Sequence, residues 1–123
     1  MAFVFDNPNP RHNLVGDCVI RALSIVTGEP WERIYAKLCA YGFMLCDMPS
    51  SNAVWGRFLT DLGYQRSSCP DCTVRTFSSR NPDGRFVLGT GTHVICVIDG
   101  DYHDTWDSGD ETPIFVWRLK DGI

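Results

Sequence analysis

The hydrophobic residues in the first half of the chain recur with the period of an α-helix. Asp17 has the side chain expected of an N-cap, and Gly28 is expected to end the first helix, over residues 18–28. Four apolar positions would share one face of this helix: Val19, Ala22, Leu23 and Val26. Three further helices are predicted, over residues 30–42, 50–63 and 73–80.

The second half of the chain changes to short runs that are rich in β-branched and aromatic residues. Gly, Asp or Pro separates these runs, a pattern typical of strands. Asp99-Gly100 lies between two of the runs and predicts a tight hairpin turn. Residues 1–13 are expected to form an extended lead-in and residues 64–72 an irregular segment. Strands are predicted within residues 84–90, 93–99, 102–108 and 113–119.

Helices followed by strands predict an α+β fold in which N-terminal helices pack on a C-terminal antiparallel β-sheet. With 123 residues, of which 44% are hydrophobic and 21% charged, the chain is expected to form a single globular domain over residues 1–123.

Charge and hydropathy narrow the function classes. The net charge is −4 and Lys and Arg form no cluster, so we expect no nucleic-acid partner. No apolar run approaches the roughly 20 residues that cross a bilayer, so we expect no membrane segment. The first residues lack the features of a signal peptide, which favours a cytoplasmic location.

Two residues that are distant in the sequence form a candidate catalytic pair. Cys18 would lie in the first turn of the first helix, next to Asp17, where the helix N-terminus favours a thiolate and can hold an oxyanion. His93 opens a predicted strand and could act as the base for this cysteine. The structural alternatives are a small buried thiol and a histidine bound by a backbone carbonyl.

The predicted hairpin supplies a third member. If Asp99-Gly100 forms a two-residue turn, Asp104 lies diagonally across from His93 on the same face of the sheet. Asp104 would then orient the imidazole and stabilise its charged form. A three-residue turn would bring Asp107 to that face instead, so Asp107 is the reserve candidate.

These segments resemble the papain-like cysteine peptidases. In that superfamily the order is Cys, His, then Asn or Asp, and the third residue often lies in an Asn-Ser-Trp run whose aromatic ring covers the His–Asn contact. Asp104-Thr105-Trp106 is similar to this run. The resemblance implies a papain-like fold with Cys18 as nucleophile, His93 as base and Trp106 as the cover.

The resemblance covers roughly residues 13–118, although only the Cys and His–Asp segments carry specific motifs. In size the chain is closer to the minimal bacteriocin-processing peptidases than to papain itself. The strings GDCVIRAL and HVICVIDGDYHDTWDSGDE are also similar to small proteins of bacteriophages and gut bacteria.

The chain departs from the superfamily at the oxyanion site. The glutamine usually found six residues before the nucleophile is replaced by His12. Asn13 has the required side-chain amide and is the candidate oxyanion donor, with His12 as an alternative. The Cys-Gly-Ser-Cys-Trp signature of papain is absent.

The remaining cysteines include possible ligands of a metal ion. Without a secretion signal, the six cysteines are expected to be free thiols. Cys69 and Cys72 have metal-ligand spacing, and Cys39 and Cys46 could complete a four-thiolate zinc site. Their spacing does not indicate such a site, so we favour a loop with two thiols and expect no metal or other cofactor.

The sequence therefore predicts a cysteine peptidase or amidase that cleaves a peptide or isopeptide bond in a peptide or protein substrate. Three alternatives stay open. An amine could displace water at the same site, giving a transglutaminase-like acyltransferase. The chain could be a non-catalytic papain-fold module that binds a peptide, or a zinc-stabilised interaction domain built on the Cys69–Cys72 loop.

Overall fold

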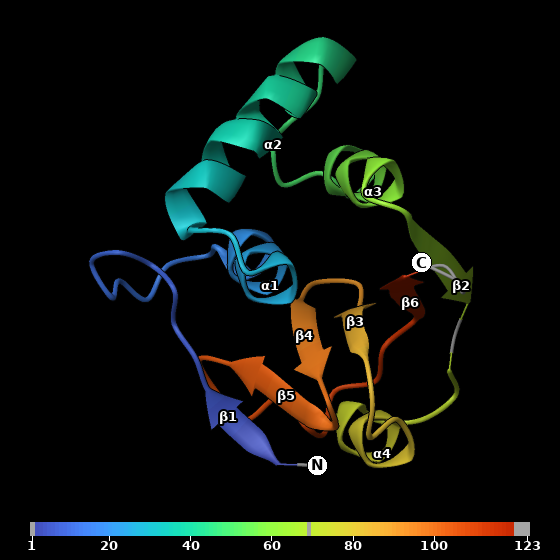
Figure 1. Ribbon diagram of the computed structural model, residues 1–123. Coiled ribbons are helices and arrows are strands. Elements are labelled where there is room, and N and C mark those ends of the chain that lie inside the picture. The colour runs from blue at the N-terminus through green and yellow to red at the C-terminus, as the bar shows by residue number, and fades with distance from the viewer. Residues whose placement is uncertain (1, 69, 120–123) are drawn as a thin grey trace.

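The computed structural model describes residues 2–68 and 70–119 and combines four helices with a six-stranded sheet (Figure 1). In chain order the elements are β1 (Phe3–Phe5), α1 (Cys18–Thr27), α2 (Trp31–Leu45), α3 (Asn52–Asp61), β2 (Tyr64–Ser68), α4 (Val74–Arg80), β3 (Arg85–Gly89), β4 (Val94–Ile98), β5 (Asp101–Asp104) and β6 (Phe115–Leu119). The predicted α+β class is confirmed.

The sheet has the strand order β1-β5-β4-β3-β6-β2. Every neighbouring pair is antiparallel except β1 and β5, which are parallel. The expectation of a wholly antiparallel sheet was therefore wrong at one edge. The lead-in segment passes beside the last strand of the hairpin and adds a short parallel strand there.

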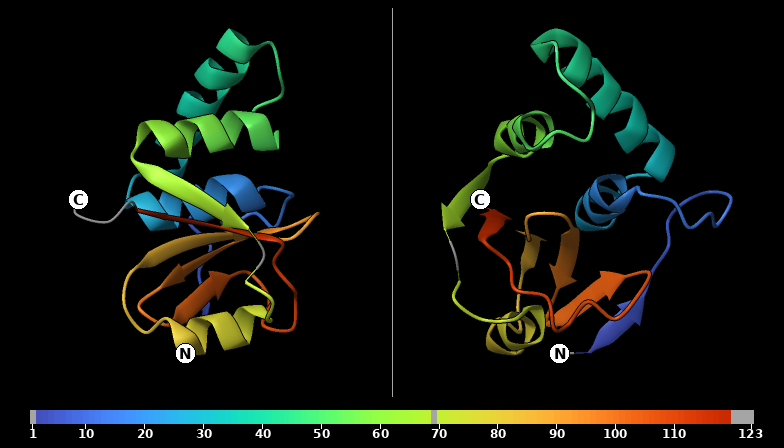
Figure 2. Two further views of the ribbon diagram at one scale, coloured as in Figure 1. Left: turned by 90° about the vertical axis from the view of Figure 1, so that its right-hand side faces the viewer. Right: turned by 180° about the vertical axis from the view of Figure 1, so that it is seen from behind.

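Helices cover both faces of the sheet (Figures 1 and 2). Helices α1 and α3 pack on one face, and α2 packs on these two helices; the shared core includes Leu23, Ile34 and Trp55. Helix α4 lies on the opposite face, where Val74 and Phe77 contact strand residues. The alternation of buried side chains along the central strands supplies apolar contacts to both helical layers. None of the described helices is both long and apolar enough to cross a membrane.

Two parts of the chain differ from the elements expected there. Residues 64–68, predicted to be irregular, form the edge strand β2; only Tyr64 in it is buried, so the apolar alternation that marks a strand is missing. Helix α2 continues past Gly42 to Leu45 and ends at Cys46, whose φ is 55°. Gly42 is buried because the chain folds back over it, and its carbonyl accepts a 2.9 Å hydrogen bond from the Asp47 N–H.

The β4–β5 hairpin has the register expected from the sequence. Asp99 and Gly100 form a two-residue turn with φ values of 48° and 84°, the left-handed conformation that this turn requires. Ile98 pairs with Asp101, and the same register brings Asp104 opposite the position two residues after His93. The hairpin therefore places the histidine and the aspartate diagonally across one end of the sheet.

Candidate active site

Cys18 is the first residue of α1 and its free thiol is half-buried. Burial raises the pKa of this thiol, but hydrogen bonds from His93 and from the backbone N–H of Val94 outweigh burial, and the pKa is lowered overall. Cys18 also lines two hollows of the surface, so its side chain can be reached from solvent. The thiol is therefore accessible and loses its proton more readily than an ordinary cysteine.

His93 lies beside Cys18, with which it lines the same two cavities, and it is bonded to Asp104. Its Nε2 lies 2.6 Å from Asp104 Oδ2, so Nδ1 is the ring nitrogen that Asp104 does not occupy. Burial alone would lower the pKa of His93, but the hydrogen bonds to Asp104 and Cys18 raise the pKa to about 9. The imidazole thus favours its charged form next to a thiol whose pKa is lowered.

The Asp104 carboxylate is buried and held from several sides. Besides His93, it accepts hydrogen bonds from the Ser108 hydroxyl at 2.7 Å and from the Thr105 N–H at 2.8 Å. Burial raises the pKa of this carboxyl, yet the hydrogen bonds from His93 and Ser108 lower the pKa overall. Asp104 therefore stays ionised and fixes the orientation of the imidazole.

Trp106 packs against the imidazole, as the resemblance implied. The ring centroids of Trp106 and His93 are 5.0 Å apart, and Trp106 is 47% exposed. The indole thus separates part of the His93 ring from water.

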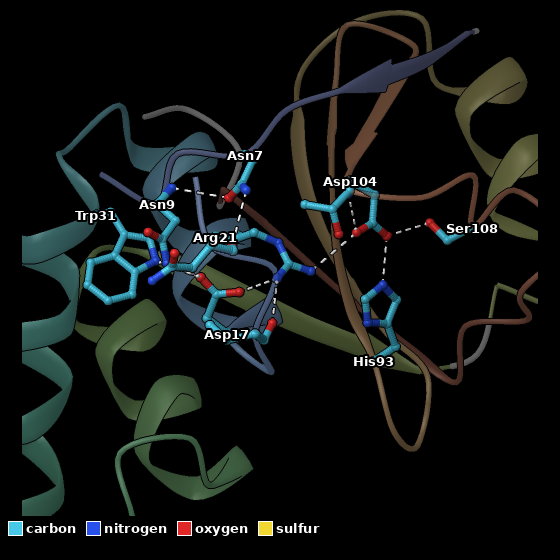
Figure 3. A network of polar contacts seen from close by, with 11 residues as sticks. Asn7, Asn9, Asp17, Arg21, Trp31, His93, Asp104 and Ser108 are labelled. Atoms are coloured by element: carbon cyan, nitrogen blue, oxygen red, sulfur yellow. Dashed lines mark hydrogen bonds and ion pairs between the residues drawn. The ribbon is translucent and has the colours of Figure 1, made fainter. Parts of the chain in front are cut away.

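A buried ion pair that the sequence did not predict adjoins this site (Figure 3). Arg21, one turn along α1, forms an ion pair with Asp17 and donates to Asp104 Oδ1 at 3.4 Å. Asp17 stands at the N-cap position, but its side chain makes no capping hydrogen bond. Instead its carboxylate accepts from Arg21 and, at 2.9 Å, from the Trp31 indole N–H. The local signal was the i, i+4 spacing of Asp17 and Arg21.

Asp107, the reserve candidate, does not reach the imidazole. Its carboxylate accepts a 2.7 Å hydrogen bond from the Tyr102 hydroxyl and a longer one, at 3.5 Å, from Arg75. The two-residue hairpin turn excludes the register that would have brought Asp107 to His93.

Asn13, the candidate oxyanion donor, is exposed, and its backbone carbonyl accepts a 3.2 Å hydrogen bond from the Asn7 side chain. It lines neither of the two cavities beside Cys18. His12 is also exposed, with a φ of 57°. The structure therefore does not bring the Asn13 amide to the site.

Two cavities flank Cys18 and His93, and both residues line each of them. One, of about 260 Å³, is lined mainly by small or uncharged polar residues, among them Ser50, Asn52 and Thr90. The other, of about 330 Å³, includes the exposed apolar side chains of Leu14, Val15 and Trp106. Cys18 and His93 are thus shared by two hollows, each with both polar and apolar walls.

No protein-family model matches this chain, and no curated protein or solved structure is significantly similar to it. The chemistry of the site must therefore be argued from the residues themselves.

The five described cysteines are free thiols, and they are not equivalent. Cys96 is completely buried on β4, and burial raises its pKa, the opposite of the effect at Cys18. Cys69 lies outside the described residues, so the pairing of Cys69 with Cys72 is not described either. Within residues 2–68 and 70–119, no group of three or more His, Cys, Asp or Glu side chains is placed to hold a metal ion.

Proposed function

We propose that this chain is a papain-like cysteine hydrolase that cleaves a peptide or isopeptide bond. The observation that carries the proposal is the placement of Cys18 and His93 around the same two cavities, with His93 Nε2 2.6 Å from Asp104 Oδ2, together with a lowered pKa at the thiol and a raised pKa at the imidazole. A cysteine paired in this way with a histidine and an orienting carboxylate is an activated nucleophile.

In the proposed reaction, the Cys18 proton passes to Nδ1 of His93, and the thiolate attacks the substrate carbonyl carbon to form a C–S bond. The N–H groups at the start of α1 would hold the oxyanion. His93 then gives its proton to the leaving nitrogen as the C–N bond breaks. Water, deprotonated by His93, attacks the resulting thioester, which releases the acid and regenerates the thiol. Asp104 holds the imidazole in place throughout.

A papain-like arrangement is part of the proposal. It is supported by the placement of the nucleophile at the start of a helix, of His93 directly before β4, and of Asp104 at the end of the adjacent strand β5. The two hollows on either side of Cys18 would accommodate an extended chain on both sides of the scissile bond. A peptide or protein segment is therefore the substrate class that we propose.

An activated ester tests the reaction without knowledge of the natural substrate. With an N-acylglycine p-nitrophenyl ester, we expect repeated turnover and an acyl group on Cys18 by mass spectrometry. Cys18→Ser and His93→Ala should reduce turnover by about 100-fold or more, because each removes a reacting group. Cys46→Ser, which changes an exposed cysteine, is the matched control.

The proposal predicts that this control variant turns over at the wild-type rate. If the wild-type protein is instead acylated once and slowly, to the same extent at Cys18 and Cys46, and shows no turnover, the proposal is contradicted. That result would favour a non-catalytic module. Faster release of product when an amine is added, with the acyl group transferred to that amine, would identify the acyltransferase instead.

A further inference from the structure

Arg21 is a buried cation that contacts two carboxylates of the candidate site. One belongs to Asp17, directly before Cys18, and the other to Asp104, the partner of His93. Only 6% of Arg21 is exposed. Its Nη1 contacts the Asp17 carboxylate and donates to the Val15 carbonyl at 3.3 Å, while its Nη2 lies 3.4 Å from Asp104 Oδ1. Figure 3 shows the guanidinium between the two aspartates, with His93 on the far side of Asp104.

The role of this guanidinium follows from the number of positive and negative charges in the site. When the Cys18 proton is on His93, the site contains three anions: Asp17, Asp104 and the thiolate. Arg21 and the imidazolium are the two cations that face them. Charges in a buried site interact strongly, and an unpaired buried anion is costly. Without Arg21, three anions would share a single cation.

Of the three anions, the thiolate is the one that would take up a proton if Arg21 were absent. Asp104 is held ionised by His93, Ser108 and the Thr105 N–H, whereas the thiol only has to retain its proton. Arg21 is also among the charges that lower the pKa of Cys18 against the effect of burial. Loss of the guanidinium should therefore appear first as a loss of thiolate.

We infer that Arg21 is a positioning residue whose charge, shared between Asp17 and Asp104, allows the Cys18 thiolate and the His93 imidazolium to coexist. This inference rests on the proposed function. Arg21 touches no reacting atom in the proposed mechanism, and it acts through the two carboxylates. Its Asp17 contact also connects α1 to α2, because Trp31 donates to the same carboxylate.

The other ionisable groups near this network have their own partners. His103 on β5 is 3.0 Å from Asp6, at the end of β1. Asp107 is bonded to Tyr102 and Arg75. Helix α2 contributes the Trp31 indole to this network, and the indole is neutral. The cations that act on the Cys18 thiol are thus His93, directly before β4, and Arg21 from α1 itself.

The test is the pH dependence of iodoacetamide labelling at Cys18 in the full chain, read by mass spectrometry. In Arg21→Met we expect the inflection of the labelling rate against pH to move upward by at least about one pH unit. Labelling at pH 6 should then be about tenfold slower than in wild type. Arg21→Lys should keep the inflection within roughly half a unit of wild type, because the charge is retained. In Asp17→Asn/Arg21→Met, which removes one anion together with the cation, most of the shift should disappear.

An Arg21→Met inflection equal to that of wild type would overturn the inference, as would a double variant with the same inflection as Arg21→Met. If Arg21→Met does not fold, judged by circular dichroism, the inflection of Asp17→Asn is compared with that of Asp17→Asn/Arg21→Met. The double variant should then inflect at the higher pH, and equal values overturn the inference. A wild-type inflection near the ordinary thiol value of about 8.5 would instead contradict the proposed function itself.

Discussion

Asp104→Asn should lower the pKa of His93, because it keeps the shape of the side chain and removes its charge. His93 Nε2 lies 2.6 Å from the carboxylate, in a buried setting where a charge-assisted hydrogen bond is strong. The His93 pKa rises from 6.5 to about 9 through Asp104 and Cys18 together. At about 1.4 kcal/mol per pH unit, this net rise, which includes the opposing effect of burial, favours the imidazolium by roughly 3 to 4 kcal/mol.

The share that belongs to Asp104 can be measured once Cys18 is removed. In Cys18→Ala the imidazole titrates without a coupled thiol, so its pKa refers to one group. We expect the His93 pKa in this background to lie above 6.5, and the added Asp104→Asn change to lower it by about one to two pH units. Burial, which lowers the His93 pKa, would then have little to oppose it.

The assay is the titration of the His93 ring protons by NMR in Cys18→Ala and in Cys18→Ala/Asp104→Asn. Asp107→Asn in the same background is the matched control, because that carboxylate binds Tyr102 and Arg75 and does not contact the imidazole. The control should leave the His93 pKa unchanged within a few tenths of a unit. An Asp104→Asn variant with the same His93 pKa as its parent would refute the reasoning.

Three further predictions concern the surroundings of the site and the fold. Trp106→Ala should expose the His93–Asp104 contact to water and slow Cys18 alkylation near pH 6 by roughly tenfold, whereas Trp106→Phe should retain most of the rate. In Cys18→Ala the stabilisation from protonated His93 is fully present below about pH 6.5 and is lost as the pH rises through the raised pKa. The free energy of unfolding in urea should therefore fall across that range, and a flat profile would contradict the assignment. Gly28→Ala should cost about 1 kcal/mol, since Gly28 has a φ of 76°, whereas Gly91→Ala should change stability by less than about 0.5 kcal/mol; equal losses in urea unfolding would contradict this.

The hairpin could be predicted because its signals are local. Asp99-Gly100 specifies a two-residue turn, and the two-residue period of a strand then determines which side chains share a face. These two facts were enough to place Asp104 beside His93. The start of α1 at Cys18 and its end at Gly28 were also visible in the sequence, because Gly28 adopts the left-handed conformation that ends a helix.

The network behind the site could not be predicted in the same way. Arginine is rarely buried, and nothing in the sequence near Arg21 indicates that its side chain lies inside the protein. Its contact with Asp104 spans 83 positions and leaves no local pattern. Strand β2 escaped detection because its pairing with β6 depends on backbone hydrogen bonds between mostly exposed residues. Asn13 has the side-chain chemistry of an oxyanion donor, but no local pattern shows that it lies outside the cavities beside Cys18.

The most direct test of the central claim, that Cys18 and His93 form a reactive ion pair, is the rate of iodoacetamide labelling of Cys18 against pH in wild type and His93→Ala. Exposed Cys46 in the same chain serves as the internal reference for the reagent. We predict that wild-type Cys18 labels selectively well below about pH 8.5, the ordinary thiol pKa, and that this low-pH reactivity disappears in His93→Ala. Labelling of Cys18 that follows an ordinary thiol titration, or that is the same with and without His93, would contradict the ion pair and the proposed hydrolase.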